Sequence, residues 1–322
     1  MGNFSSRAAI TTQPNLTGRV LMVTGANRGI GFETAKQLYR MGGTVYLGVR
    51  SEENARRAME LIRADVPSSD GQLKWLPLDL STVGKTRESA EAFLKAEDRL
   101  DVLTANYSVN NACIGDAPFE LNDDGIENMM ATKWVLGSRI QLKTELTFRS
   151  HVGHYVLTTT LLDLMRRTST EKGSDVRIVN LANLLFTKEL QRRLDSEGSS
   201  IIAVSVHPGY VATGRFADLK KSVFVLNPFL AAARESTAKM PILGWISEIL
   251  VKMFFIDEAA GARNSVYAAS DPTVRSDSQK HRGSFITPVG KIATPSDLAQ
   301  NQDLARDLWN LTEKLVYQRM NP

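Results

Sequence analysis

Eight residues near the amino terminus have the types and the spacing of a phosphate-binding turn. They follow a strand-like run at residues 19–23 and read Thr24-Gly25-Ala26-Asn27-Arg28-Gly29-Ile30-Gly31. Glycines at these places let the chain turn sharply, let its backbone approach a pyrophosphate, and let a helix begin close to the sheet. The free N–H groups and the dipole of that helix would hold the negative charge. Because the loop joins an expected strand to an expected helix, it predicts a dinucleotide site, with a purely structural turn as the alternative.

Two arginines indicate which dinucleotide this site would bind. Arg50 stands at the end of the expected second strand, nineteen residues after Gly31, and Arg28 lies inside the glycine loop. An acidic residue at the strand end would bind the ribose 2′-hydroxyl of NAD, whereas guanidinium groups suit the 2′-phosphate of NADP. The pattern therefore favours NADP (NADPH), and NAD with a solvated Arg50 is the alternative.

The composition allows a single large α/β core. The chain has 322 residues, of which 43% are hydrophobic, and a formal net charge of +4. Because the basic residues are scattered rather than clustered, no nucleic-acid partner is expected. The single cysteine, Cys113, excludes an internal disulfide and fits a reducing compartment, so we expect a cytoplasmic protein.

The apolar segments indicate weak peripheral membrane contact at most. The most apolar region, residues 223–256, is interrupted by charged residues and prolines, so no transmembrane segment is expected. It could cover a substrate, lie on a membrane surface, or pack as helices on a sheet. The start Met1-Gly2-Asn3-Phe4-Ser5-Ser6 matches the myristoylation pattern, and a polar leader over residues 1–17 is the plainer interpretation.

Apolar residues alternate along the chain between the period of strands and the period of helices. Strands are expected at residues 20–24, 44–49, 73–80, 100–103, 176–180, 201–206 and 283–288. Helices are expected at residues 30–41, 155–165, 181–194 and 298–317, with further helical faces at 55–62 and 90–94. Strands separated by such helices imply parallel crossovers. The pattern therefore predicts an α/β fold with a doubly wound parallel sheet in a single domain over residues 18–322.

Five strings of residues give the chain a resemblance to the short-chain dehydrogenase/reductase family, in its branch of retinol-dehydrogenase-like and secondary-metabolism enzymes. They are residues 24–31, Asp79-Leu80, Asn110-Asn111-Ala112, residues 181–190 and residues 207–213. The resemblance implies a Rossmann-type oxidoreductase domain that binds a nicotinamide dinucleotide.

The resemblance also implies roles for the residues of these strings. Asp79 and Leu80 would flank the adenine ring, and Asn111 and Ala112 would line the cofactor at the end of the fourth strand. The nicotinamide end would be touched by Pro208, Gly209, Val211 and Thr213. The alternatives are that Asp79 caps a helix and that Pro208-Gly209 is a plain turn.

The proton-transfer residues of that family have no counterpart in this chain. By resemblance, its members use an Asn-Ser-Tyr-Lys tetrad, in which lysine lowers the pKa of the tyrosine that serves as general acid or base. Tyr-x-x-x-Lys would put both side chains on one helix face, but none of the seven tyrosines has a lysine four residues later. Asn180 joins Leu181 directly where relatives carry the Ser, Tyr and Lys segment, and Ser150 stands in place of the asparagine. We therefore name no catalytic residue.

Three abrupt edits interrupt strings that are otherwise intact. One is the loss after Asn180, and the others are residues 104–108 and the insert 133–150, which have no counterpart in the family pattern. Residues 216–256 would form the substrate cover by resemblance. Misdrawn exon boundaries in a translated gene and decay into a pseudoenzyme both explain such edits, and the intact strings outside the breaks favour the first.

The leading functional hypothesis is an NADP-dependent short-chain oxidoreductase that moves hydride between nicotinamide and a lipophilic ketone, aldehyde or alcohol, in secondary metabolism. We expect no turnover from the chain as written, because no group is placed to move the proton. The alternatives are a non-catalytic NADP-binding or interaction protein, and a chain that does not fold stably. His151 and His154 are spaced like metal ligands, but with no acidic cluster beside them no metal site is expected.

Overall fold

The computed structural model describes residues 14–106, 151–181, 183–209, 211 and 257–321 of the chain. Three of the expected site residues, Asn111, Ala112 and Thr213, lie outside the described residues. The insert 133–150 and the expected substrate cover 216–256 also lie outside them. The fold and the site below are therefore those of the described ranges.

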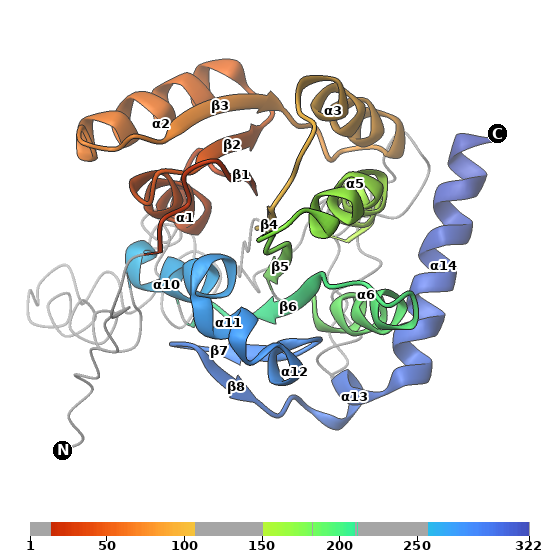
Figure 1. Ribbon diagram of the computed structural model, residues 1–322. Helices are drawn as coiled ribbons and strands as arrows, with labels where there is room; N and C mark the ends of the chain where they lie inside the picture. Colours follow the sequence, from red (N-terminus) through yellow and green to blue (C-terminus); the bar gives the residue numbers. More distant parts are fainter. Residues whose placement is uncertain (1–13, 107–150, 182, 210, 212–256, 322) are drawn as a thin grey trace, which may run out of the picture.

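An eight-stranded sheet forms the centre of the described structure (Figure 1). Its strands are β1 (Val20–Thr24), β2 (Thr44–Val49), β3 (Gln72–Pro77), β4 (Val102–Ala105), β5 (Arg177–Leu181), β6 (Ile202–Val206), β7 (Phe285–Thr287) and β8 (Lys291–Ala293). They lie in the order β3-β2-β1-β4-β5-β6-β7-β8. All neighbours pair in parallel except β7 and β8, which are antiparallel. The predicted doubly wound parallel sheet is confirmed, with one antiparallel edge strand that the sequence pattern did not predict.

Helices cover both faces of this sheet (Figure 1). They are α1 (Gly29–Arg40), α2 (Glu52–Asp65), α3 (Val83–Ala96), α5 (Val152–Thr170), α6 (Leu184–Ser196), α10 (Glu258–Ser270), α11 (Pro272–Ser276), α12 (Ser278–His281), α13 (Asp297–Gln300) and α14 (Gln302–Met320). The helices α1, α2 and α10 pack on one face, and α3, α5, α6 and α14 pack on the other. This arrangement buries both faces of every central strand, as a parallel sheet requires.

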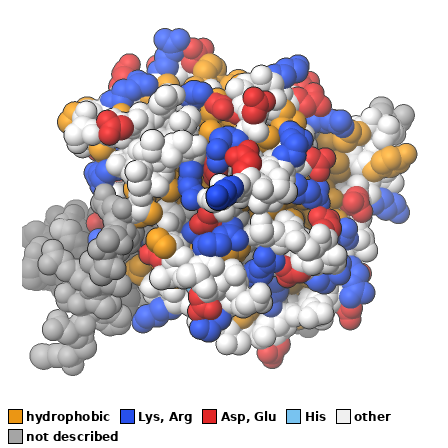
Figure 2. Space-filling view, viewed as in Figure 1, with side chains coloured by type: hydrophobic (Ala, Val, Ile, Leu, Met, Phe, Trp, Pro, Cys, Tyr) orange, Lys and Arg blue, Asp and Glu red, His pale blue; other side chains and the backbone are white. Residues whose placement is uncertain are grey.

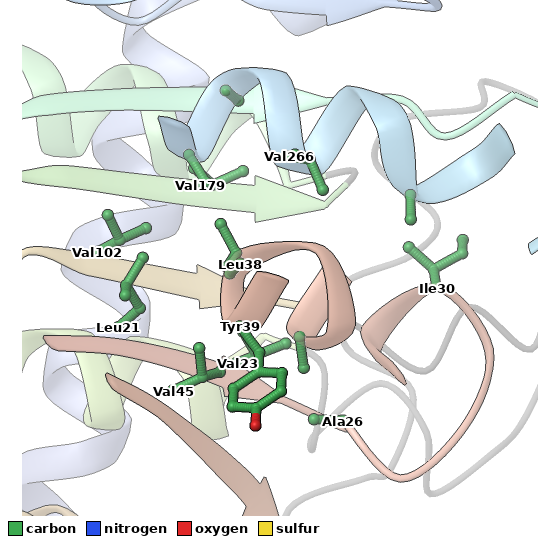
Figure 3. Close-up of a cluster of buried hydrophobic side chains, with 14 of the residues drawn as sticks. Leu21, Val23, Ala26, Ile30, Leu38, Tyr39, Val45, Val102, Val179 and Val266 are labelled. Atoms are coloured by element: carbon green, nitrogen blue, oxygen red, sulfur yellow. The ribbon is translucent and has the colours of Figure 1, made fainter. Parts of the chain in front are cut away.

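Each face of the sheet carries its own apolar core because side chains alternate along a strand. On the α1 side, Figure 3 shows Val23 and Val179 from the strands packed with Leu38 of α1 and Val266 of α10. This is the first core. On the other side, the neighbouring residue Ile178 packs with helices α3, α5 and α6 in the second core. The alternation in sequence therefore decides which helix each strand residue contacts.

Side-chain caps fix where several helices begin. Ser51 accepts a hydrogen bond from the backbone N–H of Asn54 at 3.3 Å, at the start of α2. Thr82 accepts one from Lys85 at 3.2 Å, at the start of α3. Each such cap stabilises a helix by about 1 kcal/mol. In contrast, no side chain caps the start of α1.

The carboxyl end of α10 is held to the sheet by a buried arginine. Arg177 of β5 is only 2% exposed and donates from Nη1 to the carbonyl of Ala268 at 3.0 Å. It also donates from Nη2 to the carbonyl of Asp271 at 2.9 Å, while its Nε donates to Asp175 at 3.0 Å. Burying a guanidinium is costly unless its donors are satisfied, and these partners satisfy it. Helix α10 therefore has a fixed position against β5, which places its first residues beside the glycine loop.

Several element boundaries differ from the expected ones for identifiable reasons. The third strand ends at Pro77 rather than at residue 80, since its register with β2 ends at Val49. Leu181 belongs to β5 rather than to the following helix, because it pairs with Val206 and is 1% exposed. Leu16 lies within the expected polar leader but is buried, and its N–H donates to the carbonyl of Met41 at 2.8 Å.

An aromatic cluster attaches α14 to the body of the protein. The Trp309 ring stacks on Phe186 of α6 at 5.5 Å between centroids and meets Tyr155 of α5 edge-on at 5.0 Å. The guanidinium of Arg193 lies 4.5 Å from the Trp309 ring centroid. Such rings bury large apolar areas, and their contacts with other rings and with a guanidinium stabilise the packing of α14.

We expect Trp309→Ala to lower the free energy of unfolding by about 3–5 kcal/mol, because it removes the side chain that three partners enclose. Tyr317→Ala on the same helix is the matched control, since Tyr317 is 69% exposed. That control should change the free energy by less than about 0.5 kcal/mol. Urea unfolding of both variants measures the difference, and similar losses would contradict this role for Trp309.

Candidate functional site

The glycine loop between β1 and α1 has the geometry that the sequence predicts. Gly25 and Gly29 adopt positive φ angles of 62° and 63°, where residues with a Cβ are strained. Gly31 lies so close to the preceding turn that a Cβ would be 2.4 Å from the carbonyl oxygen of Gly25. Only glycine fits that contact. The loop therefore brings the start of α1 directly against the end of β1.

The start of α1 has no side-chain cap from its own N-cap residue. Its N-cap residue, Arg28, is extended and makes no side-chain cap, and the first turn contains no acidic residue. The backbone N–H groups of a first helical turn have no partner inside the helix. Together with the helix dipole, they favour an anion at this place. Arg28 itself is exposed, and Asn27 is partly exposed beside it.

A buried hydrogen-bond chain fixes the end of β1. The Thr24 hydroxyl donates to the carbonyl oxygen of Asn106 at 3.0 Å, and it lies 2.9 Å from Nε2 of His154 on α5. Because the single hydroxyl proton is directed at Asn106, Nε2 of His154 must be the donor in the second contact. His154 thus has a structural role within the described residues, between β1 and α5.

Asn106 is a strand-end residue beside the glycine loop that the sequence interpretation did not name. It follows β4 directly, and its carbonyl oxygen would lie 3.6 Å from a Cβ on Gly25. Its side chain is only 5% exposed, yet neither amide atom has a hydrogen-bond partner in the described structure. Buried amides are normally paired. Asn106 therefore stands directly after the end of β4, whereas Asn111, which the sequence analysis expects at the end of this strand, lies outside the described residues.

The ends of β2 and β3 gather charges near the glycine loop. Arg50 is exposed just after β2, and Asp79 follows β3 with its carboxylate 3.8 Å from Nζ of Lys85. Burial alone would raise the pKa of Asp79, but hydrogen bonds from Ser81 and the charges of Lys85 and Arg50 lower it below its ordinary value. Asp79 accepts from the N–H of Ser81 at 2.9 Å, so it closes a turn, while Thr82 caps the following helix.

Two side chains hold the Asp79 turn and the Arg50 turn in place. The indole N–H of Trp75 donates to the carbonyl oxygen of Val49 at 2.8 Å, directly before Arg50. Leu80 packs against the second core, where Gly153 of α5 approaches so closely that a Cβ would be 2.9 Å from the Cβ of Leu80. The strand-end residues are thereby positioned by β3 and by α5.

The residues after β6 meet the start of α1 across helix α10. A Cβ on Gly261 of α10 would lie 2.6 Å from Val211 and 3.4 Å from Ile30. Val211 and Ile30 belong to the same core, so two segments far apart in sequence lie together. The expected residues Pro208 and Gly209 lead into this contact, and Gly209 has a φ of 85°.

Helix α10 supplies further residues that the sequence interpretation missed. Asn264 donates from Nδ2 to the carbonyls of His207 at 2.9 Å and Ile286 at 2.8 Å, which ties β6 to β7. Glu258 lies in its first turn, and its carboxylate would be 3.7 Å from a Cβ on Gly29. Asp257 caps the helix by accepting from Ala260 at 2.6 Å. An acidic cap followed by small residues was the available signal for this helix.

His207 is the titratable residue at the end of β6. Its Nδ1 accepts a hydrogen bond from the N–H of Gly209 at 3.0 Å, which places the ring proton on Nε2. Burial lowers the pKa of His207 below its ordinary value. The ring is therefore neutral at neutral pH and shapes the turn that precedes Val211.

The five described tyrosines lie in different surroundings. Tyr39 is buried in the first core, and Tyr46 donates to Glu97 at 2.6 Å beside Lys74. Tyr155 belongs to the Trp309 cluster, and burial raises its pKa above its ordinary value. The remaining described tyrosines are Tyr267, bonded to Thr273 and His281, and the exposed Tyr317. Tyr107 and Tyr210 lie outside the described residues.

Only two residues connect β5 to α6. Leu181 ends the strand, and α6 begins at Leu184 with Asn183 as its N-cap. Nδ2 of Asn183 donates to Nδ1 of His151 at 3.1 Å, and Nε2 of His151 donates to the Thr312 hydroxyl at 2.9 Å. Thr312 in turn donates to the carbonyl of Leu308 at 2.7 Å. The short connection is thus enclosed by α5 and α14.

The described residues lack two features, a metal-ligand cluster and a membrane-spanning helix. No group of three or more His, Cys, Asp or Glu side chains in these ranges is placed to hold a metal ion. Among the described helices, none has both the length and the apolar content needed to cross a membrane.

Replacing Gly31 with alanine tests the close approach at the loop. We expect Gly31→Ala to lower the free energy of unfolding by about 1–3 kcal/mol, because the new methyl group would overlap the Gly25 carbonyl. Gly84→Ala in α3 is the matched control, since a Cβ there meets nothing within 4 Å. It should stabilise the protein by up to about 1 kcal/mol. Thermal unfolding that showed the two variants alike would refute the contact.

We expect acid to lower the free energy of unfolding through the buried side chain of His151. Burial first, and the nearby His154 second, lower the pKa of His151 from 6.5 to about 4. The contribution of neutral His151 to the free energy of unfolding is complete above pH 6.5. It is lost between pH 6.5 and about 4, because in that range the unfolded chain binds a proton that the folded chain does not. The full loss is roughly 3 kcal/mol. Urea unfolding across this range should show a smaller loss in His151→Gln, and equal pH dependence in both proteins would count against it.

Comparisons with known proteins agree with this geometry. Residues 19–138 match the family model described as short chain dehydrogenase. A short-chain dehydrogenase/reductase of Colletotrichum higginsianum is 31% identical, covering 94% of this chain and 76% of its own. Another, from Armillaria gallica, is 30% identical and covers 99% of both chains.

Solved structures share the fold. An uncharacterised protein from Mycobacterium paratuberculosis superposes with a TM-score of 0.61 at 24% identity, over 96% of this chain and 97% of its own. L-Sorbose reductase from Gluconobacter frateurii, determined with NADPH and L-sorbose, has a TM-score of 0.58 at 16% identity, over 87% and 98%. With its glycine loop, its sheet order and these relatives, the chain belongs to the short-chain dehydrogenase/reductase family of oxidoreductases.

Proposed function

We propose that this chain derives from an NADP-dependent short-chain oxidoreductase and that, as written, it binds NADP(H) without turning over a carbonyl substrate. The gene's product would move hydride between nicotinamide and a lipophilic ketone, aldehyde or alcohol, in secondary metabolism. The observation that carries the cofactor half is the uncapped start of α1 beside two arginines. The observation that carries the catalytic half is the two-residue connection between β5 and α6.

We propose that a dinucleotide would lie along the sheet edge, in contact with three groups of residues. The pyrophosphate loop would be Thr24, Gly25, Asn27, Arg28, Gly29, Ile30 and Gly31. The adenine and ribose end would be Arg50, Asp79 and Leu80. The nicotinamide end would be Asn111, Ala112, Pro208, Gly209, Val211 and Thr213, to which we add Asn106 because its buried amide lacks partners.

Arg50 supports NADP over NAD. It stands where an acidic residue would otherwise bind the ribose hydroxyls, and it is exposed and able to meet a 2′-phosphate. Its charge already acts on Asp79, which follows the neighbouring strand β3. The presence of NADPH in L-sorbose reductase, which shares the fold, agrees with this choice.

We expect no turnover because the sequence has no Tyr-x-x-x-Lys pair to transfer the proton. The described tyrosines are engaged elsewhere, and the β5–α6 connection has no room for a serine loop and a Tyr-x-x-x-Lys turn. The alignment with the Armillaria relative runs over 357 positions although the chain has 322 residues. At least 35 positions of that relative therefore face a gap in this chain, which supports the loss of a segment.

A non-catalytic NADP-binding protein is the second candidate. The hydrogen bonds from Asn183 to His151 and from His151 to Thr312 favour it, because they enclose the short connection instead of leaving it open. Under either candidate we propose one domain over residues 18–322, with an insert at 133–150 and a substrate cover at 216–256. A cytoplasmic location, with at most peripheral membrane contact, agrees with the single cysteine.

The mass of the protein from its native cell separates the two candidates. A peptide that spans Asn180-Leu181, in a protein of 35.5 kDa, would establish the non-catalytic form. A longer product with a Tyr-x-x-x-Lys peptide after Asn180, and without residues 133–150, would establish an active reductase. The same spectrum would show whether Gly2 is acylated.

Cofactor choice is tested by Arg50→Glu. We expect the dissociation constant of this variant for NADPH to rise at least about tenfold, because the carboxylate repels the 2′-phosphate. Its dissociation constant for NADH should be nearly unchanged. Arg57→Glu, an exposed arginine on α2, is the matched control and should leave both constants unchanged. Nicotinamide fluorescence measures both affinities. A preference of the unaltered chain for NADH would overturn the assignment.

Turnover is a separate test on the same protein. The unaltered chain should bind NADPH but show no carbonyl-dependent loss of nicotinamide absorbance with lipophilic ketones and aldehydes. Cofactor-dependent reduction by the purified chain would refute the catalytic half of the proposal while leaving the cofactor half intact.

A further inference from the structure

Helices α1 and α10 begin side by side, and only α10 has an acidic residue in its first turn. The first turn of α1 contains no acid, whereas that of α10 contains Glu258. A Cβ on Gly261 of α10 would lie 3.4 Å from Ile30 of α1. Figure 1 shows the two helices next to each other, and Figure 3 shows Ile30 directed at α10. The acid of one helix therefore lies close to the start of the other.

The carboxylate of Glu258 lies at the glycine loop. Its Oε1 would be 3.7 Å from a Cβ on Gly29, and its Cδ would be 4.0 Å from it. A Cβ is two bonds, about 3 Å, from the amide nitrogen of its own residue, so Oε1 is no more than about 7 Å from the nitrogen of Gly29. The amides of this loop are the groups proposed above to hold the pyrophosphate. A negative charge of the chain itself therefore lies beside them.

The backbone that carries Glu258 is fixed at both ends of α10. At the start, Asp257 accepts a hydrogen bond from the N–H of Ala260 at 2.6 Å. Near the other end, buried Arg177 donates to the carbonyl of Ala268 at 3.0 Å. Because the helix is held in place, only the side-chain torsions of Glu258 can move its carboxylate away from the loop.

This carboxylate has opposite effects on the free protein and on a bound dinucleotide. In the free protein it complements the dipoles of two helices, since an anion beside a first helical turn is stabilising. A bound pyrophosphate carries two negative charges, which the carboxylate would repel. On the face seen in Figure 2, basic and acidic side chains lie among one another, so their fields largely cancel at a distance. A single nearby carboxylate therefore matters for the local potential.

We propose that Glu258 lowers the affinity of the site for its dinucleotide, because its carboxylate competes with the pyrophosphate for the start of α1. This inference rests on the proposed function, since it concerns the same site. It predicts an equal effect on NADPH and NADH, in contrast to Arg50, which would act on the 2′-phosphate. The alternative is that Glu258 only stabilises the first turn of α10, which predicts no gain in affinity when its charge is removed.

Glu258→Gln tests the proposal, because it removes the charge and keeps the shape of the side chain. We expect the dissociation constants for NADPH and NADH to fall about tenfold at low ionic strength. In about 1 M salt, which screens charges beyond about 3 Å, this gain should shrink to about twofold or less. Adenosine 2′-monophosphate, which has no pyrophosphate, should bind the variant and the unaltered chain equally. Isothermal titration calorimetry measures all three ligands.

Two further variants act as controls on charge. Asp303→Asn removes an acid from the first turn of α14, which packs on the other face of the sheet, and it should leave all three constants unchanged. Glu258→Lys should tighten the binding of NADPH more than Glu258→Gln does, because it adds an attractive charge.

The outcomes separate this inference from the proposed function. Equal binding of NADPH by the unaltered chain and Glu258→Gln, or a gain for NADPH without one for NADH, would overturn the inference and leave the proposed function standing. A gain that persists undiminished in high salt would also overturn it. Failure of the unaltered chain and both Glu258 variants to bind either dinucleotide would overturn the proposed function, and this inference with it.

Discussion

The close approach of α1 to β1 is the constraint on which the rest of the structure depends. A side chain at Gly31 would overlap the Gly25 carbonyl, so the helix can begin against the strand only with glycine at this position. The same contact leaves the first turn of α1 without a side-chain cap of its own and directs it at the sheet edge. Val211 and Gly261 then pack on Ile30, which brings α10 and the segment after β6 to the same place. The candidate cofactor site is thus built around the place where one helix meets one strand.

The connection between β5 and α6 is the part of the sheet edge on which the proposed loss of turnover depends. In a doubly wound sheet, reacting groups come from loops at the carboxyl ends of the strands. Here that connection has two residues, and Asn183 donates a part-buried hydrogen bond to His151. Membership of the family rests instead on the fold and on the relatives.

Helix α14 shows how the two cores extend beyond the sheet. Trp309 joins it to α5 and α6, and Thr312 joins it to the short connection through His151. The helix is consequently joined to the connection between β5 and α6 as well as to the second core.

The sequence by itself determined the local features of the fold. Glycine spacing defined the loop from Thr24 to Gly31, and apolar periodicity placed every parallel strand within a few residues, because both are set by neighbours along the chain. Tertiary structure decided the rest. Asn106 became the strand-end residue because β4 runs to Ala105, and α10 reached the loop because buried Arg177 holds its far end. Leu181 stayed in the sheet because it pairs with Val206. Those outcomes depend on contacts between segments far apart in sequence, which periodicity does not encode.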